Sequence, residues 1–192
     1  MNMPAGLYIA LFLIALLFAV KVIYVVTMGL VLSKTGGALF CSTDGSKIDV
    51  ILDALPVKEN HTVIDLGCGD GRFLAAAAKR CGARGIGYEI NLSAYVMARV
   101  RQMFLKGRVV IKRENFWDAS LGEADIVFCY LFPDILERLS SKAENELKAG
   151  AFLVSCNFPV PGWKPRQILN SLQPSQQDPI FIYKASQEAG RD

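Results

Sequence analysis

The sequence has little histidine and no paired cysteines, and these shortages exclude several common kinds of active site. Its single histidine, His61, stands in a polar turn, so Ser-His-Asp and Cys-His catalysis have only a poor candidate. The five cysteines form no C-x-x-C pair and have no histidine cluster beside them, which argues against a zinc site and a disulfide framework. We therefore expect the cysteines to be buried thiols in a reducing compartment.

The chain also has no run of like charges and no familiar phosphate-binding signature. Its net charge is +3 and its lysines and arginines are scattered, so the charge pattern does not indicate a nucleic-acid partner. The phosphate loop G-x-x-x-x-G-K-[ST] does not occur. The dinucleotide pattern G-x-G-x-x-G would need a glycine where the chain has Arg72.

What the sequence does have, at its start, is a long apolar run. Residues 4–32 contain one charge, Lys21, and as a helix they would reach about 43 Å, more than the roughly 30 Å of a bilayer core. No lysine or arginine precedes the run, and the run is too long for a typical signal peptide, so we expect a transmembrane anchor instead. Lys21 either reaches toward an interface or marks the end of a shorter span.

The charges that follow the apolar run indicate its orientation. Lys34, Lys47 and Lys58 come after it, while only the amino terminus precedes it. By the positive-inside tendency, the rest of the chain lies on the cytoplasmic side. We therefore expect a single-pass membrane protein.

Strand and helix signals alternate beyond the anchor. Residues 33–61 are expected to form a turn-rich linker with a short amphipathic helix, which Asp44 or Ser46 caps and which ends before Pro56. Residues 62–192 are expected to form one domain. Its strands are predicted at 62–66, 83–90, 108–113, 124–130 and 151–156, with helices at 72–80, 93–106 and 133–148, and with a terminal hairpin of 168–172 and 180–183.

This alternation predicts the fold class and part of the core. Continuously apolar strands separated by helices imply an α/β fold whose sheet is mostly parallel and covered on both faces. An apolar stripe on the second helix is expected to belong to the core. Its members are Tyr95, Met97, Ala98, Met103, Phe104 and Leu105.

The glycine-rich stretch VIDLGCGDGR, residues 63–72, lies between the first strand and the first helix of this domain. In a parallel sheet the backbone approaches the ligand closely at this turn, and glycines remove the β-carbons that would block it. The pattern D-x-G-x-G-x-G, which starts at Asp65, resembles motif I of the class I S-adenosylmethionine-dependent methyltransferases. The resemblance implies a Rossmann-like sheet and S-adenosylmethionine as cofactor, with no metal. The candidate cofactor-binding residues are Asp65, Gly67, Cys68, Gly69 and Gly71.

Features of the next three strands agree with this resemblance. Glu89 ends the second strand, where a carboxylate can accept hydrogen bonds from both ribose hydroxyls. After the third strand, in ENFWD, Asn115 and Phe116 are candidates to hold the adenine, as the resemblance implies. The fourth strand ends at Tyr130, which therefore faces the methyl-transfer crevice. Tyr130 and Asp118 are the candidate catalytic residues that would orient the acceptor amine.

The anchor and the motif FPVPGW, residues 158–163, narrow the resemblance. Together they look like the membrane-anchored protein-lysine methyltransferases of mitochondria that modify ATP synthase subunit c and the adenine nucleotide translocase, and like their prokaryotic relatives. This implies N-methylation of lysine in a membrane-associated protein, with the domain on the cytoplasmic or matrix-equivalent side. Trp163, with Pro159 and Pro161, is expected to form a lip over the acceptor.

Other reactions remain open. The stretch CYLFP lacks the [DN]-P-P-[YFW] pattern of exocyclic-amine methyltransferases, so methylation of adenine or cytosine is disfavoured. A small-molecule or lipid methyltransferase, an aminopropyltransferase and a non-catalytic adenosyl-binding module are the alternatives.

Overall fold

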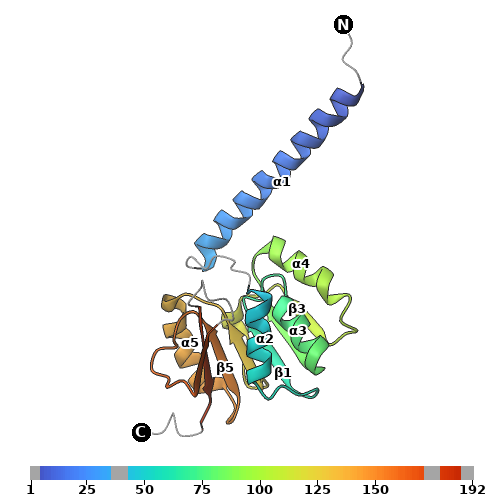
Figure 1. Cartoon of the computed structure of the whole chain (residues 1–192). Helices are drawn as coiled ribbons and strands as arrows, with labels where there is room; N and C mark the ends of the chain where they lie inside the picture. The colour runs from blue at the N-terminus through green and yellow to red at the C-terminus, as the bar shows by residue number, and fades with distance from the viewer. Residues whose placement is uncertain (1–4, 36–42, 171–177, 187–192) are drawn as a thin grey trace. The chain divides into compact units, whose positions relative to one another are not determined.

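The computed structural model describes residues 5–35, 43–170 and 178–186 (Figure 1). The chain divides into two compact units, with the boundary between residues 39 and 40. The described part of the first unit is one helix, α1 (Ala5–Thr35). The second unit is an α/β domain.

α1 has the length and composition of a membrane-spanning helix. Its 31 residues rise about 46 Å. Its described side chains from Gly6 to Val26 are exposed, and most of them are apolar. Among the described residues it is the one helix long and apolar enough to cross a membrane.

The second unit is built on a seven-stranded sheet in the order β3-β2-β1-β4-β5-β7-β6. The strands are β1 (Thr62–Leu66), β2 (Arg84–Tyr88), β3 (Val109–Lys112), β4 (Ile126–Cys129), β5 (Phe152–Cys156), β6 (Gln167–Asn170) and β7 (Pro179–Lys184). The first five strands run parallel, and β6 and β7 form an antiparallel hairpin against β5. The predicted mostly parallel sheet with a C-terminal hairpin is therefore confirmed, although residues 171–172 of the predicted hairpin lie outside the described residues.

Helices cover both faces of this sheet. They are α2 (Gly45–Ala54), α3 (Arg72–Cys81), α4 (Leu92–Gln102) and α5 (Pro133–Glu146), with a short 3-10 helix η1 (Phe116–Asp118). Ile51 of α2, Phe73 of α3 and Ala98 of α4 share one buried cluster on one face. α5 buries Leu136 and Leu139, which are not in that cluster, and Figure 1 shows α5 on the other side of the sheet.

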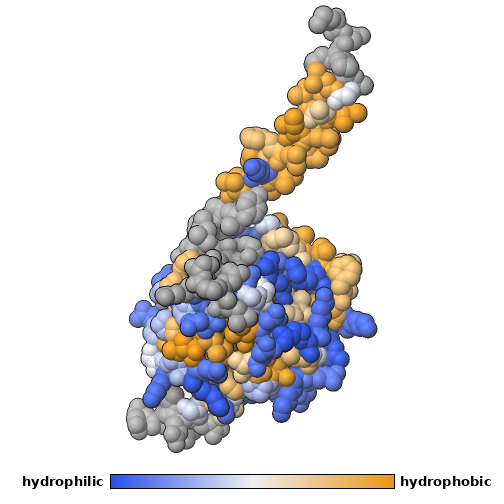
Figure 2. Space-filling model, viewed as in Figure 1, coloured by the Kyte–Doolittle hydropathy of each residue, from blue (hydrophilic) through white to orange (hydrophobic). Residues whose placement is uncertain are grey.

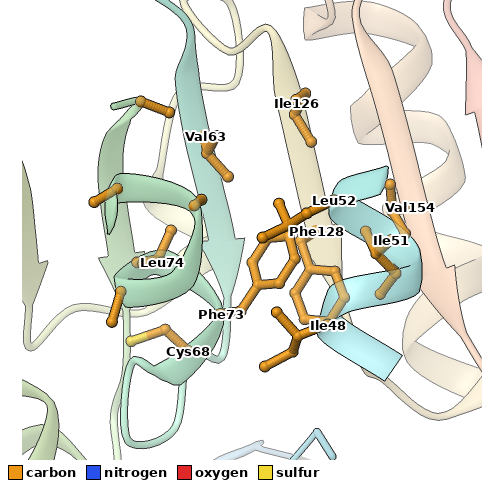
Figure 3. Close-up of a cluster of buried hydrophobic side chains, with 14 of the residues drawn as sticks. Ile48, Ile51, Leu52, Val63, Cys68, Phe73, Leu74, Ile126, Phe128 and Val154 are labelled. Carbon is orange, nitrogen blue, oxygen red and sulfur yellow. The ribbon is translucent and has the colours of Figure 1, made fainter. Parts of the chain in front are cut away.

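The centre of the first cluster is an aromatic pair (Figure 3). The rings of Phe73 and Phe128 stack with centroids 4.0 Å apart and planes 20° from parallel. Ile48 and Ile51 of α2 lie beside this pair in the close-up. The predicted cap of α2 is confirmed at Asp44, whose carboxylate accepts a hydrogen bond from the Ser46 N–H at 3.0 Å. The short amphipathic helix thus closes the core near the glycine turn.

The structure corrects the predicted stripe on the second helix. Ala98 and Leu105 are buried and Tyr95 packs against the core, but Met97, Met103 and Phe104 are exposed. The prediction is wrong for these three because they lie on the side of α4 and its following turn that the rest of the domain leaves exposed. A β-carbon at Gly71, which begins α3, would lie 3.3 Å from the Ala98 β-carbon.

The cysteines agree in part with the expectation of buried thiols. Cys68, Cys129 and Cys156 are buried, and Cys81 is partly exposed. Cys41 lies outside the described residues.

Phe73→Ala should lower the free energy of unfolding by about 3–5 kcal/mol, because it removes one ring of a stacked pair in a closed core. Urea denaturation measures the change. Phe104→Ala deletes the same side chain where it is 75% exposed, so this control should change stability by no more than about 0.5 kcal/mol. Equal losses in the two variants would contradict the packing described here.

Candidate functional site

The glycine turn joins the end of β1 to the start of α3. Gly67, Gly69 and Gly71 have φ angles of 79°, 55° and 73°, in the left-handed region that favours glycine. The N–H groups of Gly67 and Cys68 donate to the carbonyl oxygen of Tyr88 at 3.0 and 2.9 Å. The turn is therefore held against the end of β2, with its backbone at the carboxyl edge of the sheet.

Glu89 follows β2 and holds the same turn through its side chain. One carboxylate oxygen accepts from the Gly69 N–H at 2.8 Å, and the other accepts from the Asn91 N–H at 2.7 Å. Burial raises the pKa of Glu89, and the hydrogen bonds from the backbone of Asn91, Gly69 and Ile90 oppose that rise. The carboxylate thus fixes the glycine turn, and its remaining lone pairs can accept hydrogen bonds from a ligand.

Asp65 of β1 and Cys68 of the turn are both buried, with different consequences for a ligand. Burial raises the pKa of the Asp65 carboxyl well above its ordinary value, and the charges of Glu89 and Asp70 raise it further. The Cys68 side chain points into the core, where a β-carbon at Gly87 would lie 2.7 Å from its sulfur. Cys68 can therefore offer only its backbone to a ligand.

A small cavity of about 20 Å³ lies beside this turn. Its lining residues are Thr43, Asp65, Gly67, Cys68, Gly69, Asp70, Arg72, Phe73, Phe128 and Tyr130. A larger cavity of about 490 Å³ includes Thr62 and Arg84, the first residues of β1 and β2. We assign the site to the small cavity because ligands of open parallel sheets bind at the carboxyl ends of the strands.

Tyr130 follows β4 and lies beside two residues that were not among the predicted site residues. The side-chain amide of Asn157, directly after β5, donates to the Tyr130 hydroxyl oxygen at 2.6 Å. The Lys47 ammonium, on α2, donates to the Asn157 amide oxygen at 2.9 Å and lies 5.1 Å from the centre of the Tyr130 ring. We call Tyr130, Asn157 and Lys47 the tyrosine cluster.

Lys47 determines the orientation of the Asn157 side-chain amide. An ammonium has donors only, so its contact with Asn157 places the amide oxygen toward Lys47 and the amide NH₂ toward Tyr130. The Tyr130 oxygen is then an acceptor for Asn157, and its own proton points elsewhere. Lys47 is 3% exposed and also forms an ion pair with Asp178 at 3.3 Å.

Two sequence signals could have identified these residues. Lys47 lies one turn before Ile51 on the buried face of a predicted amphipathic helix, where lysine is rare unless paired. Asn157 is polar and directly follows an apolar strand, at the edge where ligands bind. It also adopts a φ of 69°, which asparagine tolerates better than most residues.

The other predicted site residues lie on or next to η1 and do not line the small cavity. The Asn115 side chain accepts a hydrogen bond from the Trp117 N–H at 3.2 Å, so it caps η1. Phe116 is partly buried beside Trp117, and Asp118 is exposed. The roles assigned to Asn115, Phe116 and Asp118 stay predictions.

The predicted position of Trp163 in a lip over the acceptor is wrong. Trp163 packs edge-on against Tyr183, with ring centroids 6.0 Å apart, and lines a different cavity with Lys184 and Ala185. Lys184 pairs with Phe152, the first residue of β5, so this cavity lies at the opposite edge of the sheet. Trp163 therefore packs against β7 of the hairpin, away from the candidate site.

Among residues 5–35, 43–170 and 178–186, no group of three or more histidine, cysteine, aspartate or glutamate side chains is arranged to hold a metal ion. Glu89 is hydrogen-bonded to backbone, and the members of the tyrosine cluster are hydrogen-bonded to one another.

Comparisons with known proteins show that the chain is similar to methyltransferases. The profile of the ANTKMT methyltransferase domain matches residues 65–167. A protein-lysine N-methyltransferase of Saccharolobus islandicus (strain REY15A) is 32% identical over 136 residues, which are 69% of this chain and 84% of that protein. The adenine nucleotide translocase lysine N-methyltransferase of Mus musculus is 38% identical over 106 residues, 54% of this chain and 46% of that protein. The chain thus spans about half the length of the mouse relative.

A solved structure agrees with the fold. The RNA methyltransferase from Salinibacter ruber, in complex with S-adenosyl-L-homocysteine, superposes with a TM-score of 0.72 and 27% sequence identity. The match covers 79% of this chain and 98% of that one.

Asp65→Asn should stabilise the domain near pH 7. Because the pKa of Asp65 is raised in the folded chain, folding is penalised once pH exceeds the unfolded pKa of about 4, and the penalty increases toward the folded pKa. We expect the melting temperature near pH 7 to rise by about 2–4 °C, which corresponds to about 1 kcal/mol. Below pH of about 4 the variant and the parent should melt together in scanning calorimetry.

Asp125→Asn provides a control of opposite sign. Partial burial opposes the shift, but hydrogen bonds from Lys148 and from the Thr62 N–H lower the pKa of Asp125. Loss of this carboxylate should therefore destabilise the domain near pH 7. A lower melting temperature for Asp65→Asn as well would show that the Asp65 carboxylate stabilises the fold.

Proposed function

The chain belongs to the ANTKMT methyltransferase domain family and is a methyltransferase with S-adenosylmethionine as cofactor, and on this premise we propose that it N-methylates lysine in a membrane-associated protein. The observation that carries the proposal is the tyrosine cluster beside the glycine turn, within a chain similar to protein-lysine N-methyltransferases.

The residues around the glycine turn fit an adenosyl cofactor. When bound, S-adenosylmethionine supplies a methyl group on a positively charged sulfur. The bare backbone of Gly67 and Gly69 would let that cofactor approach the sheet, and Glu89 would accept hydrogen bonds from its ribose hydroxyls. The cavity of about 20 Å³ accommodates only a small part of such a ligand, so the rest would lie over the strand ends.

The tyrosine cluster would prepare the acceptor amine. A lysine substrate arrives protonated, and it must become neutral before its nitrogen can attack the methyl group. A site with little water lowers the pKa of that amine, because burial disfavours its charged form. The Tyr130 hydroxyl, oriented by Asn157, would then position the neutral amine by a hydrogen bond.

Two observations support an acceptor at a membrane. α1 has the length and composition of a membrane-spanning helix. The mouse relative is named for the adenine nucleotide translocase. Tethering the domain would raise its effective concentration near membrane proteins without any additional contact.

Incubation with methyl-labelled S-adenosylmethionine and membranes of the source organism tests the proposed reaction. We expect the label in protein, and methyllysine after acid hydrolysis, at a rate that rises with pH as the acceptor amine deprotonates. Label in a lipid extract would instead identify a lipid methyltransferase, and label in RNA would identify a nucleic-acid acceptor. Cofactor binding without transfer to any fraction would indicate a non-catalytic adenosyl-binding module.

Tyr130→Phe and Glu89→Gln should separate turnover from cofactor binding. Loss of the Tyr130 hydroxyl should lower kcat roughly tenfold, the effect of one hydrogen bond, and leave cofactor affinity nearly unchanged. Glu89→Gln should weaken cofactor binding by about 1.5–3 kcal/mol, because it removes acceptors for ribose and for the Gly69 N–H. Steady-state kinetics and calorimetric titration measure the two effects. Tyr95→Phe, the same change on α4, should leave both unchanged, and an unaltered kcat in Tyr130→Phe would remove Tyr130 from the mechanism.

A further inference from the structure

α4 buries its small side chains and exposes its large apolar ones. Ala94 and Ala98 are buried. The exposed apolar side chains of α4 and the turn after it are Leu92, Val96, Met97, Val100, Met103 and Phe104. Met103 and Phe104 are the most exposed, at 79% and 75%. We call these six residues the α4 face, and Figure 2 shows an apolar area where α4 lies in Figure 1.

The chain around the α4 face is basic. Residues 92–113 contain six lysines and arginines and no aspartate or glutamate. Arg99 and Lys106 are exposed beside the apolar side chains. An exposed apolar surface with a basic margin is the composition of elements that lie in the interface of an anionic bilayer.

Hydrogen bonds connect α4 with the point where the linker from α1 enters the second unit. Arg101 of α4 donates to the carbonyl oxygen of Asp70 at 2.9 Å and pairs with the Asp70 carboxylate at 2.8 Å. The same carboxylate pairs with Arg72 at 2.9 Å, and Arg72 donates to the carbonyl oxygen of Thr43 at 3.2 Å. Thr43 also lines the small cavity at the strand ends. The linker entry and the site therefore share one edge of the domain, which Arg101 reaches from α4. Phe104 and Lys106 lie farther along, where they line cavities with the last turn of α3 and the start of β2.

We propose that the α4 face inserts into the interfacial layer of an anionic lipid bilayer and so holds the domain against that membrane. The inference rests on the proposed membrane anchoring by α1. Seven residues separate Thr35 from Thr43, and an extended chain of that length reaches no more than about 28 Å. So short a linker would keep the second unit within reach of the bilayer. The basic margin favours lipid headgroups as the occupant over a second copy of this face, which would bring like charges together.

Tryptophan quenching by brominated lipid in the full-length protein tests the insertion. The chain is reconstituted into vesicles of phosphatidylcholine and phosphatidylglycerol, with brominated phosphatidylcholine as the quencher. Phe104→Trp places a reporter on the α4 face. Ile168→Trp places a matched reporter on β6. Ile168 is also exposed, and β6 is the outermost strand on the side of the sheet opposite to β3. The signal is the difference in fluorescence from the unsubstituted chain.

We expect brominated lipid to remove most of the added fluorescence in Phe104→Trp and little in Ile168→Trp. The quenching should decrease in vesicles without phosphatidylglycerol and in the background of Arg99→Gln with Lys106→Gln, because the basic margin then attracts the surface less. Equal quenching of the two reporters would overturn the proposal. Protection of Phe104→Trp from acrylamide without quenching by lipid would also overturn it, since a protein then covers the face.

Flotation of the same vesicles separates this inference from the proposed function. If the unsubstituted chain does not float with vesicles, the proposed anchoring fails and the insertion fails with it. If the chain floats and the reporters are quenched equally, only the insertion is refuted. Neither readout depends on methyl transfer, so the outcome of the labelling assay leaves both results interpretable.

Discussion

The hydrogen bonds between the glycine turn and the end of β2 are the interactions on which the rest of the site depends. Three glycines give the turn a large conformational freedom, which is costly to restrict on folding. The Glu89 carboxylate and the Tyr88 carbonyl oxygen select one conformation through the N–H groups of Gly69, Gly67 and Cys68. Gly87 then admits the Cys68 side chain into the core, so the turn presents backbone alone at the strand ends. The same carboxylate that orders the turn is the one proposed to receive the ribose.

The tyrosine cluster, which is proposed to position the acceptor, is assembled in a different way. Lys47 comes from α2, Tyr130 from the end of β4 and Asn157 from the end of β5, and Asp178 precedes β7. These residues are far apart in sequence, and only the closed core brings them together. α2 has a central place in this assembly, because its apolar side chains cover the stacked pair of Phe73 and Phe128 while Lys47 orients Asn157. Damage to the packing of α2 would therefore reach the site through the tyrosine cluster.

The exposed α4 face and the apolar helix α1 have one physical explanation in the proposal made above. Close packing of α4 against Gly71 requires alanine on its inner side, but nothing in that packing requires methionine or phenylalanine on its outer side. A bilayer interface would give those side chains a partner. It would also place the site, which shares an edge of the domain with the linker entry, near acceptors that do not leave the membrane.

Local patterns were sufficient for the family, the sheet and the glycine turn, because strand and helix periods, caps and glycine spacing express constraints between neighbouring residues. They predicted the parallel sheet, the terminal hairpin and the cap at Asp44. They failed for Met97, Met103 and Phe104, since periodicity identifies an apolar stripe but not whether the rest of the fold covers it. They failed also for Trp163, and they missed Lys47 and Asn157. Sequence by itself determined the elements and the cofactor. Tertiary structure alone decided which polar side chains meet at Tyr130 and which apolar face stays exposed, because both depend on contacts between residues that are distant along the chain.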